Sequence, residues 1–208
     1  MKGIFITFEG GEGSGKTTII KRLTEELTQK GYRVVCTREP GGSKIAEGIR
    51  NIILDKENTE MDYMTEALLY AASRAQHLSE KVKPALKEGK VVLCDRYLDS
   101  SLAYQGYARG LGIDRVYDIN LYATEGLLPN LTLFVDIAPS VGLDRIKQNH
   151  REEDRLDKEK IDFHERVHSG YLEVARRFPE RIKVVDGEQS VEEVYADVQK
   201  IIFDYLGV

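Results

Sequence analysis

The chain has 208 residues, of which 41% are hydrophobic and 31% charged, and its formal net charge is −5. This balance is typical of an ordinary globular protein, and the length fits one well-buried domain better than two. The acidic charge argues against broad, non-specific binding to nucleic acid or to a membrane surface, so a polyanionic ligand must be met by locally gathered arginines and lysines. No run approaches the roughly 20 apolar residues of a membrane span.

Along the chain, β-branched apolar runs alternate with stretches of helical periodicity. The runs that predict strands are Gly3–Glu9, Arg33–Arg38, Val91–Asp95, Leu131–Asp136 and Ile182–Asp186. The stretches that predict helices are Lys16–Lys30, Thr65–Glu88, Asp114–Ala123, Val141–Gln148, Asp162–Phe178 and Val191–Tyr205. Because the strand runs are continuously apolar and the alternation runs from end to end, we expect an α/β fold with a mostly parallel sheet covered on both faces.

Local signals add detail to this pattern. Pro84 should interrupt or restart the helix predicted at Thr65–Glu88, and Ser190 is a suitable N-cap for the last helix. Cys36 and Cys94 lie in strand-like runs, which predicts two buried thiols in a reducing cytosol. Residues 147–160, KQNHREEDRLDKEK, are dense in charge and predict either a solvated helix end or a mobile flap. The chain has no repeats and no Pro- or Ser-rich linker, so we expect a single domain.

The stretch FEGGEGSGKTT, residues 8–18, follows the first predicted strand and opens the first predicted helix. Its spacing fits the Walker A motif, in which glycines let backbone N–H groups converge on phosphate oxygens. Lys16 would reach the β- and γ-phosphates of ATP, and the Thr17 hydroxyl and Asp95, which ends VVLCD, would hold Mg²⁺. The ATP-binding residues predicted by this motif are Gly10, Gly11, Glu12, Gly13, Ser14, Gly15, Lys16, Thr17 and Thr18.

A Walker A loop alone does not separate a small-molecule kinase from other nucleotide-binding proteins. A Ras-like GTPase should carry an Asn-Lys-x-Asp motif, which this chain lacks. A kinase with a phosphorylated acceptor needs arginines for a second anion, and the candidates are Arg38, Arg50, Arg74, Arg96, Arg151 and Arg155. Residues 164–168 also match the zinc-protease pattern H-E-x-x-H, although nothing nearby marks a third ligand and a protease would leave the phosphate motifs unexplained.

Five segments together resemble the bacterial thymidylate kinases: FEGGEGSGKTT, TREPGG, TEALLYAASRAQHL, CDRYLDSSLAYQGYARG and REEDRLD. The resemblance implies a three-layer P-loop NTPase fold with a five-stranded parallel sheet flanked by helices, and a mobile lid at about residues 147–160. It also implies transfer of the γ-phosphoryl group of ATP to dTMP, with Mg²⁺, by a cytoplasmic homodimer in dTTP synthesis. The alternatives are a kinase for UMP or CMP, or a regulatory P-loop NTPase that has no small-molecule acceptor.

The resemblance also implies residue roles. Tyr70, where the family commonly has phenylalanine, would stack on thymine, Arg74, Ser101 and Gln105 would contact the base edge, and Tyr104 would crowd the sugar 2′ position. The cradle of the acceptor phosphate would be Arg38, Arg50 and Arg96, and Glu9 and Glu39 would lie near the sugar and the metal shell.

The catalytic arginine divides the family, because some members carry it in the Walker A loop and others in the lid. The loop here has Glu12 and Ser14 and no arginine, whereas the lid has Arg151 and Arg155. The chain therefore resembles the lid-arginine type, with Lys16, Arg96 and one of these two lid arginines as its catalytic cations.

Overall fold

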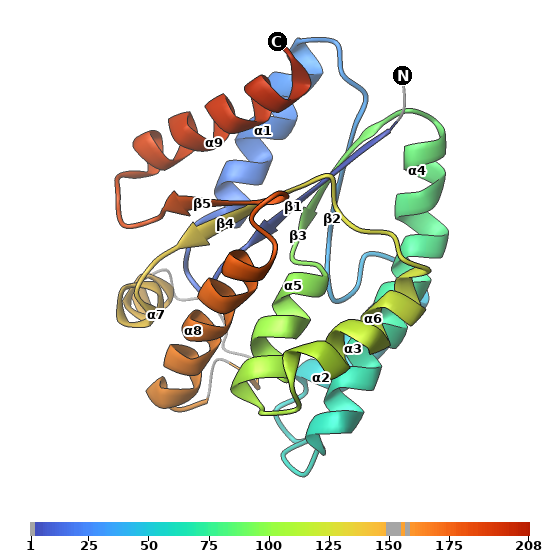
Figure 1. Ribbon diagram of the computed structural model, residues 1–208, viewed down its shortest axis with the longest axis vertical. Helices are drawn as coiled ribbons and strands as arrows, with labels where there is room; N and C mark the ends of the chain where they lie inside the picture. Colours follow the sequence, from blue (N-terminus) through green and yellow to red (C-terminus); the bar gives the residue numbers. More distant parts are fainter. Residues whose placement is uncertain (1–2, 149–154, 157–158) are drawn as a thin grey trace.

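The computed structural model of the chain describes residues 3–148, 155–156 and 159–208. Within them, five strands form one parallel sheet with the order β2-β3-β1-β4-β5 (Figure 1). The strands are β1 (Ile4–Glu9), β2 (Val34–Arg38), β3 (Val91–Asp95), β4 (Leu131–Asp136) and β5 (Ile182–Asp186). Each predicted strand is confirmed to within one residue, as is the prediction of a parallel sheet.

Helices cover both faces of this sheet (Figure 1). They are α1 (Lys16–Gln29), α2 (Lys44–Leu54), α3 (Tyr63–His77), α4 (Lys83–Lys87), α5 (Leu98–Ser101), α6 (Ile113–Thr124), α7 (Pro139–Gln148), α8 (Ile161–Arg177) and α9 (Val191–Leu206), with π-helical segments η1 (Leu78–Val82) and η2 (Leu102–Ala108). Helices α1 and α9 lie on one face, and α3, α5, α6 and α8 lie on the other (Figure 1).

The sheet separates two hydrophobic clusters, because side chains alternate along each strand. On the α1 and α9 side, Ile6 and Phe8 of β1 pack with helix residues such as Leu23 and Val198. On the opposite side, Phe5 packs with residues of the other helices. Both faces of β1 are therefore buried, as its continuous apolar run predicts.

The predicted helix Thr65–Glu88 is a succession of α3, η1 and α4. Helix α4 restarts at Lys83 with Pro84 in its first turn, which confirms the predicted effect of this proline. Ser190 also caps α9 as predicted, because its hydroxyl accepts from the Glu193 N–H in a capping box. Helix α2, helix α5 and segment η2 were not predicted.

The two cysteines differ in exposure. Cys94 is buried as predicted, but the prediction for Cys36 is wrong, because this residue is exposed. Neither thiol forms a disulfide. Cys36 belongs to the edge strand β2, only part of which is covered, so its apolar run does not ensure burial.

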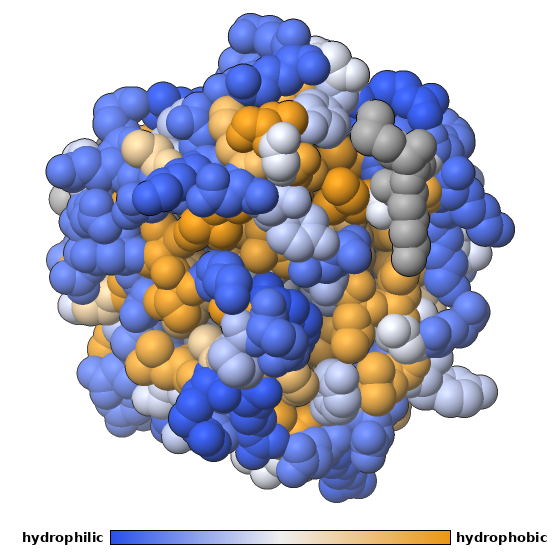
Figure 2. Space-filling model, turned by 45° about the horizontal axis from the view of Figure 1, so that its top comes forward, coloured by the Kyte–Doolittle hydropathy of each residue, from blue (hydrophilic) through white to orange (hydrophobic). Residues whose placement is uncertain are grey.

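Polar and charged side chains cover much of the face drawn in Figure 2, with apolar side chains visible between them. Within the described part of the chain, no helix is both long enough and apolar enough to cross a membrane. The flap predicted at residues 147–160 falls largely outside the described residues, which include only 147, 148, 155, 156, 159 and 160 of it.

Candidate active site

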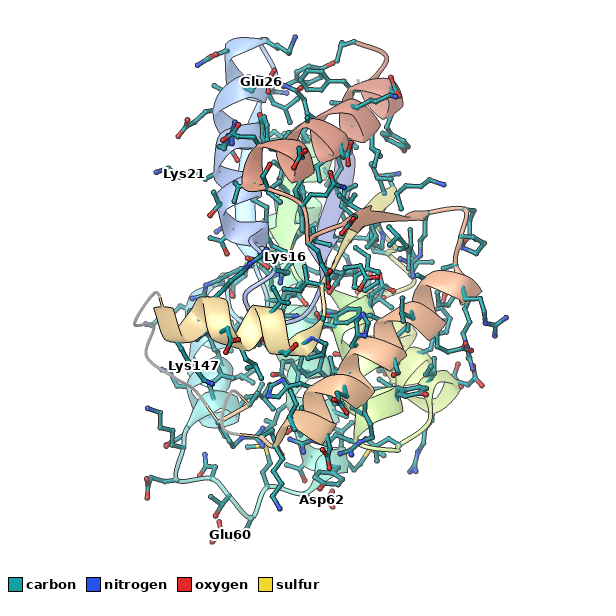
Figure 3. The ribbon with its side chains drawn as sticks, turned by 90° about the vertical axis from the view of Figure 1, so that its left-hand side faces the viewer. Lys16, Lys21, Glu26, Glu60, Asp62 and Lys147 are labelled. Atoms are coloured by element: carbon teal, nitrogen blue, oxygen red, sulfur yellow. The ribbon has the colours of Figure 1, made fainter. Side chains whose placement is uncertain are left out.

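The glycine-rich loop connects the end of β1 to the start of α1, where Lys16 is the first helical residue (Figure 3). Gly15 caps this helix with φ 86°, a left-handed conformation that glycine adopts without a steric penalty. The Lys16 ammonium donates to the carbonyls of Gly10 (3.1 Å) and Gly11 (2.9 Å) and to Ser14 Oγ (2.8 Å). Burial, and then repulsion from Arg96, lowers the pKa of Lys16 to about 8. A cation thus lies inside the loop, at the helix N-terminus.

The loop also approaches α7 closely, backbone to backbone. A Cβ added to Gly13 would lie 2.1 Å from the Gly142 carbonyl oxygen, and one added to Gly142 would lie 2.1 Å from that of Glu12. Both positions therefore require glycine for a close approach of two main chains, and Gly13 also has a positive φ of 69°.

The residues predicted to hold Mg²⁺ are adjacent. Thr17 Oγ1 donates to Asp95 Oδ2 at 2.9 Å, because strands β1 and β3 are neighbours and both end at this edge of the sheet. A hydroxyl beside a carboxylate is a hard-oxygen donor pair that fits Mg²⁺, which usually completes its shell with phosphate oxygens and water. These two residues would hold the ion.

The H-E-x-x-H pattern does not build a zinc site among the described residues, where no three His, Cys, Asp or Glu side chains are grouped to hold a metal. His168 Nε2 instead lies 2.6 Å from Asp136 Oδ1, which follows from its place on α8 beside the end of β4.

A pocket of about 560 Å³ lies beyond the loop, and we call it the inner pocket. It contains every residue that the resemblance assigns to the base and the sugar 2′ position. Its lining is Glu12, Glu39, Pro40, Arg50, Leu54, Tyr70, Arg74, Arg96, Tyr97, Ser100, Ser101, Tyr104, Gln105 and Leu156.

A second hollow of about 950 Å³, the loop pocket, opens over the Walker A loop. It is lined by Glu12, Gly13, Ser14, Gly15, Lys16, Thr17, Thr18, Arg38, Glu39, Arg50, Asp95, Arg96 and Ile146. The two pockets share Glu12, Glu39, Arg50 and Arg96. Two ligands that fill them would therefore meet at a wall that carries two arginines.

Arg96, which belongs to this shared wall, is held by hydrogen bonds to several parts of the protein. Its guanidinium donates to Gly10 O (2.8 Å), Glu12 Oε1 (2.6 Å), Tyr171 Oη (2.8 Å) and Ser100 Oγ (3.3 Å). Its backbone has φ 66°, a left-handed conformation that is uncommon for a residue other than glycine. Such strain is usually kept where function needs it, and here it accompanies a side chain held between the pockets.

Glu9 lies behind Arg96 and is not part of either pocket wall. It accepts from the Tyr97 N–H (2.8 Å), Ser100 Oγ (2.6 Å) and Tyr171 Oη (3.1 Å). Burial, and then the charge of Asp99, raises the pKa of Glu9 to about 7. In this structure the carboxyl group supports two of the residues that hold Arg96.

Glu39 and Arg74 form a buried cluster under the inner pocket. Arg74 Nε lies 2.6 Å from Glu39 Oε2, and His77 Nδ1 lies 2.9 Å from Glu39 Oε1. Arg74 also donates to Ser101 Oγ (3.1 Å), the Tyr97 carbonyl (3.0 Å) and Asn120 Oδ1. The guanidinium that is predicted to contact the base edge is thus fixed in place before a ligand arrives.

We expect the substitution Glu39→Ala to lower the free energy of unfolding by about 3–5 kcal/mol, because it leaves the buried Arg74 without its acidic partner. Glu192→Ala on α9 is the control, since its pair with Arg22 is exposed and screened by solvent and should contribute little to stability. Urea unfolding followed by circular dichroism measures both, and equal losses in the two variants would contradict this reading of Glu39.

The other two predicted phosphate arginines converge on one carbonyl. Arg38 Nη1 (2.8 Å) and Arg50 Nη1 (2.9 Å) both donate to Pro40 O. Arg38 also pairs with Glu47 at 3.1 Å, and it lines the loop pocket but not the inner pocket. The TREPGG segment therefore gathers two cations beside the shared wall.

The two candidate lid arginines cannot be compared directly. Arg151 lies outside the described residues. Arg155 Nη2 contacts Glu66 Oε2 at 2.5 Å, and its Nε donates to Ile53 O at 2.8 Å. In this structure, then, Arg155 is attached to the α2 and α3 region.

Several residues of the site were missed from the sequence. Ser100 and Tyr171 hold Arg96, Asn120 holds Arg74, and Glu66 binds Gln105 and two arginines. Only Glu66 had a signal, because it precedes Tyr70 and Arg74 at four-residue intervals and so shares their helix face. Tyr171 and Arg96 are 75 residues apart, and nothing local links them.

A parallel sheet with a Walker A loop at its edge, joined to an arginine-walled second pocket, defines a P-loop kinase for small phosphorylated acceptors. The family model described as thymidylate kinase matches residues 8–198. The chain belongs to the thymidylate kinase family.

Curated relatives and a solved structure agree with this assignment. A thymidylate kinase of Oceanobacillus iheyensis is 59% identical over 99% of this chain and 92% of its own length. One of Bacillus licheniformis is 58% identical over 99% of this chain and 98% of its own length. The crystal structure of thymidylate kinase from Ehrlichia chaffeensis has a TM-score of 0.79 at 31% identity, covering 97% of this chain and 99% of that one. The predicted P-loop NTPase fold is confirmed.

Proposed function

We propose that the chain transfers the γ-phosphoryl group of ATP to dTMP, giving dTDP and ADP. The observation that carries this proposal is the wall of Glu12, Glu39, Arg50 and Arg96, which the two pockets share. ATP in the loop pocket and a nucleoside monophosphate in the inner pocket would bring their phosphates together at two arginines. A regulatory NTPase has no need of the second pocket.

The transfer needs no general base. A phosphate oxygen of dTMP, ionised at neutral pH because its second pKa is near 6, attacks the γ-phosphorus, and the bond to the β–γ bridging oxygen breaks to release ADP. Lys16 and Arg96 would neutralise charge on the transferring group and hold the two anions in line. Mg²⁺, held by Thr17 and Asp95, would supply further neutralisation of the phosphate charge.

A lid arginine would add to this charge, as the resemblance implies. Arg151 and Arg155 both stay candidates, and Arg155 would have to leave Glu66 to serve as one. We further propose a cytoplasmic protein with one kinase domain and a lid near residues 147–160. A homodimer is supported by exposed apolar side chains on adjoining helices, namely Ile45 and Ile52 on α2, Leu68 on α3 and Tyr122 on α6.

A coupled assay of ADP release tests the substrate. With Mg²⁺ and ATP, we expect dTMP to give the highest kcat/KM among dTMP, dUMP, UMP and CMP. The loss for dUMP should be about 10–200-fold, because one methyl group in an apolar pocket contributes about 1–3 kcal/mol. A higher kcat/KM for UMP or CMP would indicate a different monophosphate kinase, and ADP release that is independent of any acceptor would indicate a regulatory NTPase.

A further inference from the structure

Behind the inner pocket, one buried carboxylate gathers donors from several elements. Glu66, on α3, is 0% exposed. Its Oε1 accepts from Gln105 Nε2 (3.0 Å) and Arg109 Nε (3.3 Å), and its Oε2 accepts from Arg109 Nη2 (3.3 Å) and Arg155 Nη2 (2.5 Å). The Walker A motif does not account for this cluster, and Glu66 and Arg109 have no part in the proposed transfer reaction.

The carboxylate is held in its charged form. Burial opposes ionisation of Glu66, but the charge of Arg109 and the hydrogen bond from Arg155 outweigh it, so the pKa of Glu66 is lowered. Arg109 is itself fixed, because it pairs with Glu159 at 2.7 Å and its guanidinium lies 4.3 Å from the ring centre of Phe163 and 4.7 Å from that of Tyr63. An ionised, immobile carboxylate can only accept hydrogen bonds.

This restriction determines which way the Gln105 amide points. Because Glu66 only accepts, Gln105 must direct its NH₂ group toward it, and the amide oxygen lies on the opposite branch of the same planar group. Gln105 is also part of the wall of the inner pocket, beside Tyr70 and Arg74. The Gln105 amide oxygen is therefore available to the inner pocket as a hydrogen-bond acceptor, and its contact with Glu66 fixes its orientation.

Pyrimidines differ at the atom that such an oxygen would meet. Thymine and uracil carry a hydrogen at N3 and can donate, whereas cytosine has a lone pair there. A fixed acceptor gains a hydrogen bond from the first two and faces repulsion from the third, and a buried polar group without a partner is costly.

We propose that Glu66 is a positioning residue that fixes the Gln105 amide and thereby makes the inner pocket select pyrimidine monophosphates with a hydrogen at N3 over cytosine ones. This inference rests on the proposed function. Glu66 lines neither pocket, and it acts on selectivity through Gln105.

The variant Glu66→Gln tests this role, because an amide at position 66 can donate as well as accept and so no longer dictates the orientation of Gln105. We expect the ratio of kcat/KM for dTMP over dCMP to fall by about ten- to hundredfold, which corresponds to one charged hydrogen bond. The ratio for dTMP over dUMP should not change, because both bases carry N3–H. A general loosening of the pocket would shift both ratios.

Glu173→Gln on α8 is the matched control, since this half-buried carboxylate also binds two arginines, Arg176 and Arg177, and should leave both ratios unchanged. Glu66→Asp is the second variant if Glu66→Gln does not fold. It retains the charge that the arginines need but withdraws the carboxylate from Gln105, and the same fall in the dTMP/dCMP ratio is expected.

An unchanged dTMP/dCMP ratio in a folded variant at position 66, or a parallel change in both ratios, would overturn the proposal. If the chain is not a dTMP kinase, the unaltered protein itself will show no preference for dTMP in kcat/KM, and this outcome is distinct from an effect of the variants.

Discussion

Lys16→Met should lower kcat for phosphoryl transfer by about 10²–10³-fold, the cost of removing one preorganised charge-stabilising donor. The Lys16 ammonium is buried in the loop and is the only lysine that lines the loop pocket among the described residues. Methionine retains the length of the side chain and loses the charge. Steady-state kinetics at saturating ATP and dTMP measure the effect.

Lys21→Met is the matched control, because Lys21 lies on the same helix and points away from the loop (Figure 3). Its kcat should equal that of the unaltered protein. Lys16 also bonds to the loop's own carbonyls, so far-ultraviolet circular dichroism and thermal unfolding must confirm that the Lys16 variant folds. A folded Lys16→Met protein with an ordinary kcat would contradict the proposed mechanism.

Arg96→Lys is expected to lower kcat by about 10²-fold or more even though the charge is retained. A single ammonium cannot reproduce the fork that contacts Glu12, Tyr171 and the Gly10 carbonyl together. Because Arg96 belongs to the wall between the pockets, its loss should affect the aligned transition state more than the binding of either ligand alone. The fall should therefore appear in kcat with a smaller change in either KM.

The corresponding control is Arg22→Lys on α1, where the guanidinium forms an exposed pair with Glu192. This variant should retain both kcat and KM. If Arg96→Lys instead raised only the KM for dTMP, Arg96 would be a binding residue for the acceptor and would not stabilise the transferring group.

The fold was predictable because its strands and helices have strong periodic patterns. The central strands β1, β3 and β4 are apolar runs buried on both faces of the sheet, and the edge strands β2 and β5 are part-exposed apolar runs, so the ends of all five were visible in the sequence. Helix α2 was missed because the exposed apolar residues Ile45 and Ile52 obscure, in the sequence, the stripe of Ala46, Ile49 and Ile53 that faces the core. Segment η2 has no simple periodicity, since its shape depends on α6 and α8 packed around it.

The site divides in the same way. The glycine-rich loop, Thr17 and Asp95 were predictable because each carries a local signal at a strand end. The residues that hold these side chains in place were not predictable, because their contacts join distant parts of the sequence. Tyr171 and Arg96 are 75 positions apart, and Arg155 and Glu66 are 89 positions apart. These contacts depend on the packing of α8 against the rest of the protein and on the position of Arg155 beside α2 and α3.

The close contact between Gly13 and Gly142 also limits how this protein can vary. No side chain lies between the two main chains to absorb a change by rotating, so a methyl group on α7 would press directly on the loop. Position 142 belongs to no nucleotide-binding motif. An alanine there would nevertheless alter ATP affinity, because it would displace the glycine-rich loop just as a substitution within the loop would. A search for variants with altered nucleotide affinity should therefore include α7.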